Sequence, residues 1–261
     1  MTNDVIGWSA LAGSLVFVLL SVLLTRAVHL SLERSIVVAV ARSLVQMLIV
    51  GAALVPIVDP DTPLAWSWLW VAGIIVFASL TVARRAPEVP GMFTVALAAH
   101  TAVAVVGLSI VYGLSVFELE GRTLVPVAGM VVGNSMKGAV VAANRVAEAV
   151  AEHRPEIEAG LALGMTTRAA SRRFVRSALR TAISPQIEQT AALGLVFLPG
   201  AMTGLILAGA DPLGAVRAQL ALMYVILAGV VIAATATGIG AIGRLSTPDQ
   251  RLRRVTRQRV A

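Results

Sequence analysis

The chain has 261 residues, of which 57% are hydrophobic and 13% are charged, and its mean hydropathy is +0.86. A soluble domain carries about twice this share of charged residues, so the composition excludes an ordinary soluble domain and favours a multi-span membrane protein. The net charge is +7, but the arginines lie beside apolar stretches, which favours membrane orientation over nucleic-acid binding. The sequence has no cysteine and therefore offers no disulfide, thiolate metal site or redox pair.

Seven apolar windows are long enough to cross a bilayer as helices. They cover residues 6–24, 36–58, 66–82, 94–114, 124–143, 188–208 and 215–242. The sequence therefore predicts an all-α, multi-pass protein of the inner (cytoplasmic) membrane, with the first window retained as a span. Because no low-complexity linker divides the chain, residues 1–261 are predicted to form a single transmembrane domain.

Charge alternates between the loops that join these windows. Arginines follow the first, third, fifth and seventh windows, whereas the opposite loops are acidic or nearly neutral. Since basic residues concentrate in cytoplasmic loops, the N-terminus is predicted outside and the C-terminus in the cytoplasm. The fifth window contains Asn134, Ser135 and Lys137, but omitting it would put the two halves of the chain out of phase.

A polar cytoplasmic segment, residues 144–184, is predicted between the fifth and sixth windows. Pro155 suits the first turn of a short helix, Gly164 can end that helix, and Thr166 or Thr167 can cap the next. Arginines then recur at a spacing of four, at Arg168, Arg172, Arg176 and Arg180. Ser184-Pro185 predicts a fresh start for the sixth span.

Two interpretations of this basic helix stay open from its residues alone. One is an amphipathic helix that lies on anionic lipid of the cytoplasmic leaflet. The other is a docking element that transmits the motion of a partner protein to the spans. The charge pattern by itself does not separate them.

The stretch EAGLALGMTT, residues 158–167, resembles the coupling motif of ABC transporter permeases, the segment that contacts the ATPase. Three longer blocks resemble the FetB/YbbM-type permease family, whose plant relatives include aluminium-tolerance proteins. They are ARSLVQMLIVGAAL (41–54), GMVVGNSMKGAVVAANR (129–145) and SPQIEQTAALGLVFLPGAMTGLILAG (184–209).

This resemblance implies an all-helical permease, expected as a homodimer in the bilayer, paired with a separate ATPase subunit that binds ATP and Mg²⁺. It also implies export of metal ions, iron in bacterial members, or of a metal-linked solute. The expected ATPase-coupling residues are Glu158, Ala159, Gly164, Thr166, Arg168, Arg172 and Arg176.

The chain itself is predicted to be neither an enzyme nor a nucleotide-binding protein. It contains no G-x-x-x-x-G-K-[ST] loop, and its single lysine, Lys137, is followed by glycine. The alternative is a stand-alone secondary transporter or channel, with Lys137, Glu188 and His100 as a relay. An intramembrane enzyme ranks last because metalloprotease and serine-hydrolase motifs are absent from the sequence.

Polar and helix-breaking residues inside the predicted spans are candidates for a translocation path, because ionisable groups in a bilayer need a partner or a cavity. Structural alternatives exist for each: Arg42 can reach the interface, Asn134 can hydrogen-bond across a helix contact, and Glu188 can favour a first helical turn. Pro199-Gly200 predicts a kink or break. The three histidines form no recognisable metal spacing, so metal ligands stay unknown. The candidates are Arg42, Gln46, Asn134, Lys137, Glu188, Gln189, Pro199, Met202 and Thr203.

Overall fold

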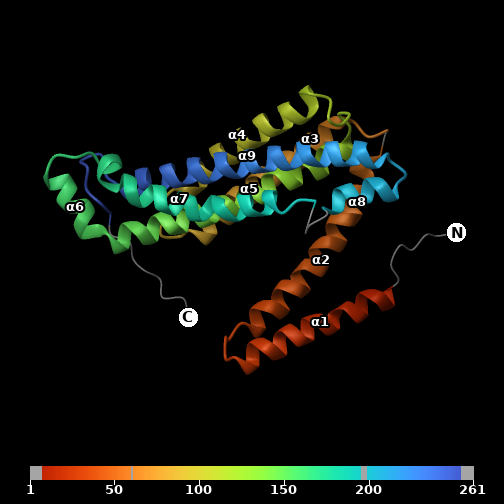
Figure 1. Ribbon diagram of the computed structural model, residues 1–261, viewed down its shortest axis with the longest axis horizontal. Coiled ribbons are helices and arrows are strands. Elements are labelled where there is room, and N and C mark those ends of the chain that lie inside the picture. Colours follow the sequence, from red (N-terminus) through yellow and green to blue (C-terminus); the bar gives the residue numbers. More distant parts are fainter. Residues whose placement is uncertain (1–7, 60, 195–198, 254–261) are drawn as a thin grey trace. The chain divides into compact units, whose positions relative to one another are not determined.

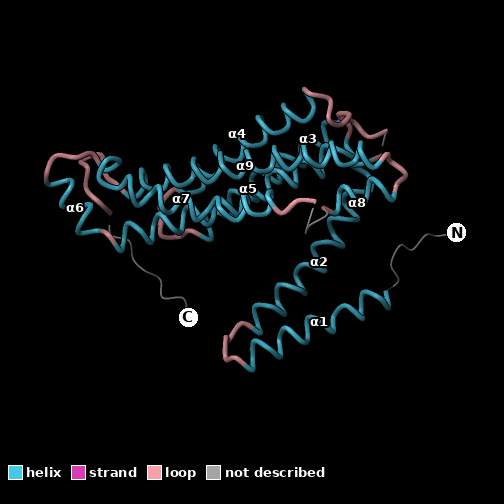
Figure 2. Tube along the Cα trace, in the orientation of Figure 1, coloured by secondary structure: helices cyan, strands magenta, loops and turns pink. Residues whose placement is uncertain are grey.

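Helices dominate the computed structural model, which describes residues 8–59, 61–194 and 199–253 (Figures 1 and 2). The all-α prediction is therefore confirmed for these residues. The helices are α1 (Trp8–Ala27), α2 (Glu33–Val58), α3 (Leu64–Arg85), α4 (Met92–Gly113), α5 (Gly121–Glu152), α6 (Arg154–Ala162), α7 (Thr167–Ala191), α8 (Gly200–Leu207) and α9 (Pro212–Leu245). They fall into two compact units, Met1–Asp59 and Pro60–Ala261. The single-domain interpretation of residues 1–261 stays a prediction.

The first unit consists of α1 and α2, which pack against each other. Within this unit α2 has no buried residue, so its apolar side chains and those of Arg42 and Gln46 are all accessible. Such exposure suits helices that lie in lipid or against other membrane helices, because neither surrounding requires a polar surface. The predicted first window begins at residue 6, and its first two residues lie outside the described part.

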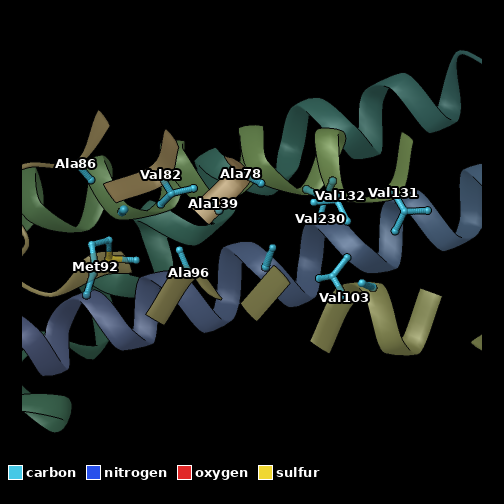
Figure 3. Packing of buried hydrophobic residues seen from close by; sticks show 14 of the residues in the cluster. Ala78, Val82, Ala86, Met92, Ala96, Val103, Val131, Val132, Ala139 and Val230 are labelled. Atoms are coloured by element: carbon cyan, nitrogen blue, oxygen red, sulfur yellow. The ribbon is translucent and has the colours of Figure 1, made fainter. Parts of the chain in front are cut away.

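The second unit is built around α5 and α9, which pack along each other and are flanked by α3, α4 and α7. Its core consists mainly of valine and alanine, including Val82, Ala96, Val131 and Ala139 (Figure 3). Small side chains allow helix backbones to approach closely, and the resulting van der Waals packing contributes to helix association in a bilayer. Gly138 shows this closeness, because an added Cβ would lie 2.8 Å from Val230 Cγ1.

Five described helices, α2, α3, α4, α5 and α9, are long and apolar enough to cross a membrane. They contain the predicted windows 36–58, 66–82, 124–143 and 215–242, and all of the window 94–114 except its last residue, which follows the end of α4. The 32 residues of α5 and the 34 of α9 correspond to roughly 48 and 51 Å, well beyond a hydrocarbon layer of about 30 Å. Both helices are therefore longer than a span requires, and the count of seven spans and the orientation stay predictions.

The predicted start of the sixth span at Ser184-Pro185 is wrong. The chain passes through Pro185 inside α7, and Ser184 Oγ donates to the Arg180 carbonyl at 2.8 Å instead of capping a new helix. Ala182 and Gln186, on either side of Pro185, are buried. We attribute the continuity to this packing, which offsets the backbone hydrogen bond that proline cannot donate.

Residues 188–208 consequently do not form one helix. The first of them end α7 at Ala191, Gly194 has φ +83°, and α8 begins at Gly200 directly after Pro199. The predicted break at Pro199-Gly200 is confirmed. Glu188 lies in the last turn of α7 and not in a first turn, so the helix dipole opposes its carboxylate and the proposed structural role is wrong.

Candidate functional site

The α6–α7 hairpin is formed by local signals that lie in its own sequence. Pro155 occupies the first turn of α6, and Gly164, with φ +84°, ends it. Met165 N–H donates to the Gly160 carbonyl at 3.0 Å, and Gly164 N–H donates to Leu161, which together form a Schellman motif. Thr166 Oγ1 then accepts from Ala169 N–H at 3.3 Å and caps α7. The predictions for Pro155, Gly164 and Thr166 are confirmed.

The hairpin is fastened to the segment that follows α9, residues 246–253. The Arg154 guanidinium donates to the carbonyls of Leu252 and Arg253, both at 3.0 Å, and its Nε donates to Glu158 at 2.7 Å. Gln250 Oε1 accepts from both Thr167 N–H and Thr167 Oγ1, at 2.7 and 2.9 Å. Sequence reasoning missed Arg154 and Gln250, since nothing local connects residues about 80 to 100 positions apart.

A small aromatic and charged cluster braces α6 against α7. The rings of His153 and Phe174 stack with their centroids 4.2 Å apart, and Arg173 Cζ lies 4.5 Å from the Phe174 centroid. Arg173 also forms an ion pair with Glu156, which is 3.0 Å from His153 Nδ1. Ile157 of α6 is fully buried. The hairpin is thus fixed on both sides and should move as one body.

The tip of this hairpin is accessible and apolar. Leu163 is 82% exposed and Met165 is 51% exposed, and the space around Gly164 is open. Of the predicted coupling residues, Glu158, Ala159, Gly164, Thr166 and Arg168 are exposed at or near this tip. Leu163 and Met165 thus leave a small apolar surface open at the end of the braced hairpin.

Beyond the tip, Arg168, Arg172, Arg176 and Arg180 of α7 line one groove of about 670 Å³, which we call the arginine groove. None of these arginines forms an ion pair with another described residue. Like charges four residues apart on a helix destabilise it by roughly 0.2–0.5 kcal/mol per pair. Another side of α7 faces the core, because Ala178 and Ala182 are buried and Ala170 and Phe174 pack against the core.

A second, smaller pocket of about 140 Å³ brings together three of the predicted path residues, Asn134, Lys137 and Gln189. It also includes Gln186, which sequence reasoning missed; this side chain is 7% exposed and its Nε2 has no partner among the described residues. Asn134 Nδ2 donates to the Met130 carbonyl, 2.8 Å away within α5, and not across a helix contact as expected. The pocket therefore offers an ammonium group and amide groups, and no carboxylate lines it.

The other predicted path residues lie elsewhere. Glu188 is exposed, does not line this pocket and, in the described structure, forms no ion pair with Lys137. Arg42 and Gln46 belong to the first unit. Pro199, Met202 and Thr203 lie at the start of α8, where Thr203 Oγ1 donates to the Pro199 carbonyl at 3.3 Å.

His100 is part of a buried contact between α3 and α4. It is completely buried in α4, and its Nδ1 lies 2.8 Å from the Ala96 carbonyl oxygen and 3.4 Å from Ser79 Oγ of α3. In the described part of the chain no three histidine, aspartate or glutamate side chains gather as metal ligands. Among the described residues no ion pair joins Lys137, Glu188 and His100, and the relay stays a prediction.

Long apolar helices with polar extensions define this chain as a multi-pass helical membrane protein. Residues 8–245 match the uncharacterised protein family UPF0014, and the chain belongs to that family. No solved structure matches the chain.

Three relatives illustrate the range of the family. The chain is 33% identical to the UPF0014 membrane protein YjkA of Bacillus subtilis over 94% of its own length and 97% of the relative. It is 30% identical to the "Probable iron export permease protein FetB" of Escherichia coli over 84% of each chain. It is 33% identical to the protein ALUMINUM SENSITIVE 3 of Arabidopsis thaliana over 85% of this chain and 81% of that one. The resemblance to FetB and plant aluminium-related proteins is therefore confirmed.

Proposed function

We propose that this chain is the membrane-spanning permease subunit of an ATP-driven ABC transporter of the inner membrane, exporting metal ions or a metal-linked solute. In the working complex two copies would pair with two ATPase subunits, which would bind the ATP and Mg²⁺. The observation that carries this proposal is the α6–α7 hairpin, whose accessible apolar tip is fixed to the long helices of the second unit.

The continuity of the helices explains how such a hairpin would act. A single residue, His153, separates α5 from α6, and α7 runs unbroken from the tip to Ala191. A push on Leu163 and Met165 would therefore be transmitted along α5 and α7 as the movement of stiff rods. The far end of α7 is at Ala191, and Gly194, with φ +83°, turns the backbone shortly after it.

The residues of the pocket around Lys137 favour one kind of transported solute over another. Lys137, Asn134, Gln186 and Gln189 supply a positive charge and amide groups, with no lining carboxylate to neutralise the charge. An ammonium group repels a bare metal cation but attracts the anionic oxygens of a ligand that carries the metal. Of the two cargoes, the pocket favours the metal-linked solute.

The test is co-purification of the full-length chain from its native membranes, followed by transport in vesicles. Leu163→Glu places a charge on the apolar tip, and we expect it to reduce co-elution of a P-loop ATPase and ATP-driven flux by about tenfold, a loss of roughly 1.4 kcal/mol. The matched control is Leu119→Glu, the same change at a 46% exposed leucine between α4 and α5, away from the tip.

Retained association in the Leu163→Glu variant would contradict docking through the tip. Full transport in liposomes that contain only this chain and no nucleotide would contradict the proposal as a whole. That second outcome would favour the stand-alone transporter or channel.

A further inference from the structure

The arginine groove has two chemically different ends. Arg168 lies where α9 ends, since it lines a neighbouring pocket together with Arg244 and Ser246. Ile183 lies further along α7, where it packs with Ala182 against Ala142 of α5 and Ala234 of α9. Ala234 lies inside the apolar part of α9. Because α7 and α9 run in opposite directions, the groove leads from the polar end of α9 towards its apolar middle (Figure 1).

The floor of the groove is apolar and closely packed. Val175, Leu179, Ile183 and Ile187 of α7 line it with Ile239 and Ile242 of α9. Gly238 makes this packing possible, because an added Cβ would lie 2.6 Å from Leu179 Cδ2. From Arg168 to Ile187 the helix rises about 28 Å, which is close to the thickness of a hydrocarbon layer.

The charge of the groove is not balanced by the chain. No carboxylate lines it, and Glu188, the residue after Ile187, is also outside its lining. Glu148, Glu156 and Glu158 lie in α5 and α6, which precede α7. These carboxylates are paired instead with Arg145, with Arg173 and His153, and with Arg154. The groove arginines are thus available to an external anion, and guanidinium groups match the oxygens of a phosphate particularly well.

We propose that the arginine groove binds an anionic phospholipid of the cytoplasmic leaflet. The phosphate lies among Arg172, Arg176 and Arg180, and an acyl chain follows Ile183 and Ile187 towards the bilayer interior. The occupant follows from the two ends of the groove: a soluble anion would leave the apolar floor uncovered, and a zwitterionic lipid would leave the arginines without a net negative partner. The hairpin tip, with Leu163 and Met165, lies outside the groove lining.

The test uses the purified full-length chain alone, without any ATPase, in uncharged detergent micelles. Phosphatidylglycerol with a fluorescent acyl chain is titrated, and phosphatidylcholine with the same label serves as the comparison. We expect saturable binding that favours phosphatidylglycerol, and a roughly tenfold weaker affinity in the double variant Arg176→Gln/Arg180→Gln. Arg173→Gln is the matched control, because Arg173 is on the same helix but contacts Phe174 and Glu156 outside the groove.

Each other outcome has a defined meaning. Equal affinity for the two lipids, or an equal loss in Arg173→Gln, would overturn the proposal. Complete displacement of the lipid by millimolar inorganic phosphate would show a site for soluble anions instead. If the double variant does not fold, Arg176→Lys/Arg180→Lys takes its place, because this variant keeps the positive charge. A preference for phosphatidylglycerol equal to that of the unchanged chain would support the proposal, and loss of that preference would contradict it.

This inference is independent of the proposed function, because the titration contains no ATPase. Loss of ATPase association in Arg176→Gln/Arg180→Gln with unchanged lipid affinity would assign the groove to the ATPase and overturn the lipid site. Loss of lipid selectivity with intact association would confirm the lipid site and leave the docking of the tip unaffected.

Discussion

The contact between α4 and α9 provides a sharp test of the small-residue packing in the second unit. Gly240 of α9 faces Val95 of α4 so closely that an added Cβ would overlap Val95 Cγ1 and lie 3.2 Å from Cγ2 and 3.3 Å from Cβ. Rotation of Val95 does not clear this space, because both methyl groups and the branch point are near and valine is restricted to one main rotamer in a helix. Gly240→Ala should therefore force the two helices apart.

The magnitude follows from two opposing effects. Overpacking of a close contact destabilises the fold by about 1–3 kcal/mol, whereas replacing glycine by alanine within a helix stabilises it by about 1 kcal/mol. Gly243, one turn further along α9, is exposed and has no atom within 4 Å of an added Cβ. Gly243→Ala should gain the helix-propensity stabilisation without overpacking any contact. The difference in the free energy of unfolding between the two variants therefore isolates the packing cost of about 1–3 kcal/mol.

The assay is thermal unfolding of each purified variant in the same detergent, followed by tryptophan fluorescence. At about 2–4 °C per kcal/mol for a chain of this size, Gly240→Ala should have a Tm lower than that of Gly243→Ala by several degrees. If Gly240→Ala melts at or above the temperature of Gly243→Ala, the close approach of α4 and α9 is refuted.

Three further predictions concern the hairpin and the pocket. Arg154→Gln removes the charged donor to residues 246–253, so hydrogen exchange of this segment should accelerate by roughly 5- to 30-fold, equivalent to about 1–2 kcal/mol. The control Arg145→Gln breaks only an exposed ion pair and should change this exchange rate little. Thr166→Ala removes the α7 cap and should destabilise the hairpin by about 1 kcal/mol, seen as faster proteolysis at its tip. Lys137→Gln should lower ATP-driven flux of an anionic metal complex more than that of the free metal ion in vesicles, and equal losses would contradict a cargo role for the ammonium group.

The sequence by itself determined the features that depend on neighbouring residues. Windows of apolar residues are a property of a continuous stretch, so five of the seven predicted spans coincide with helices long and apolar enough to cross a membrane. Helix ends depend on single residues with special backbone or side-chain properties, and Pro155, Gly164 and Thr166 act as predicted. The arginine spacing likewise predicted that the four arginines share one side of α7.

Only the tertiary structure decided which distant residues meet. The packing on both sides of Pro185 kept α7 continuous where the local signal predicted a new start. Arg154 found its partners nearly 100 residues away, and Lys137 came together with Gln186 and Gln189 and not with Glu188. The physical reason is that helix propensity and capping act within a few residues, whereas close packing selects partners by shape across the whole unit. The sequence therefore predicted which stretches are apolar helices, whereas it did not predict which residues meet in each site.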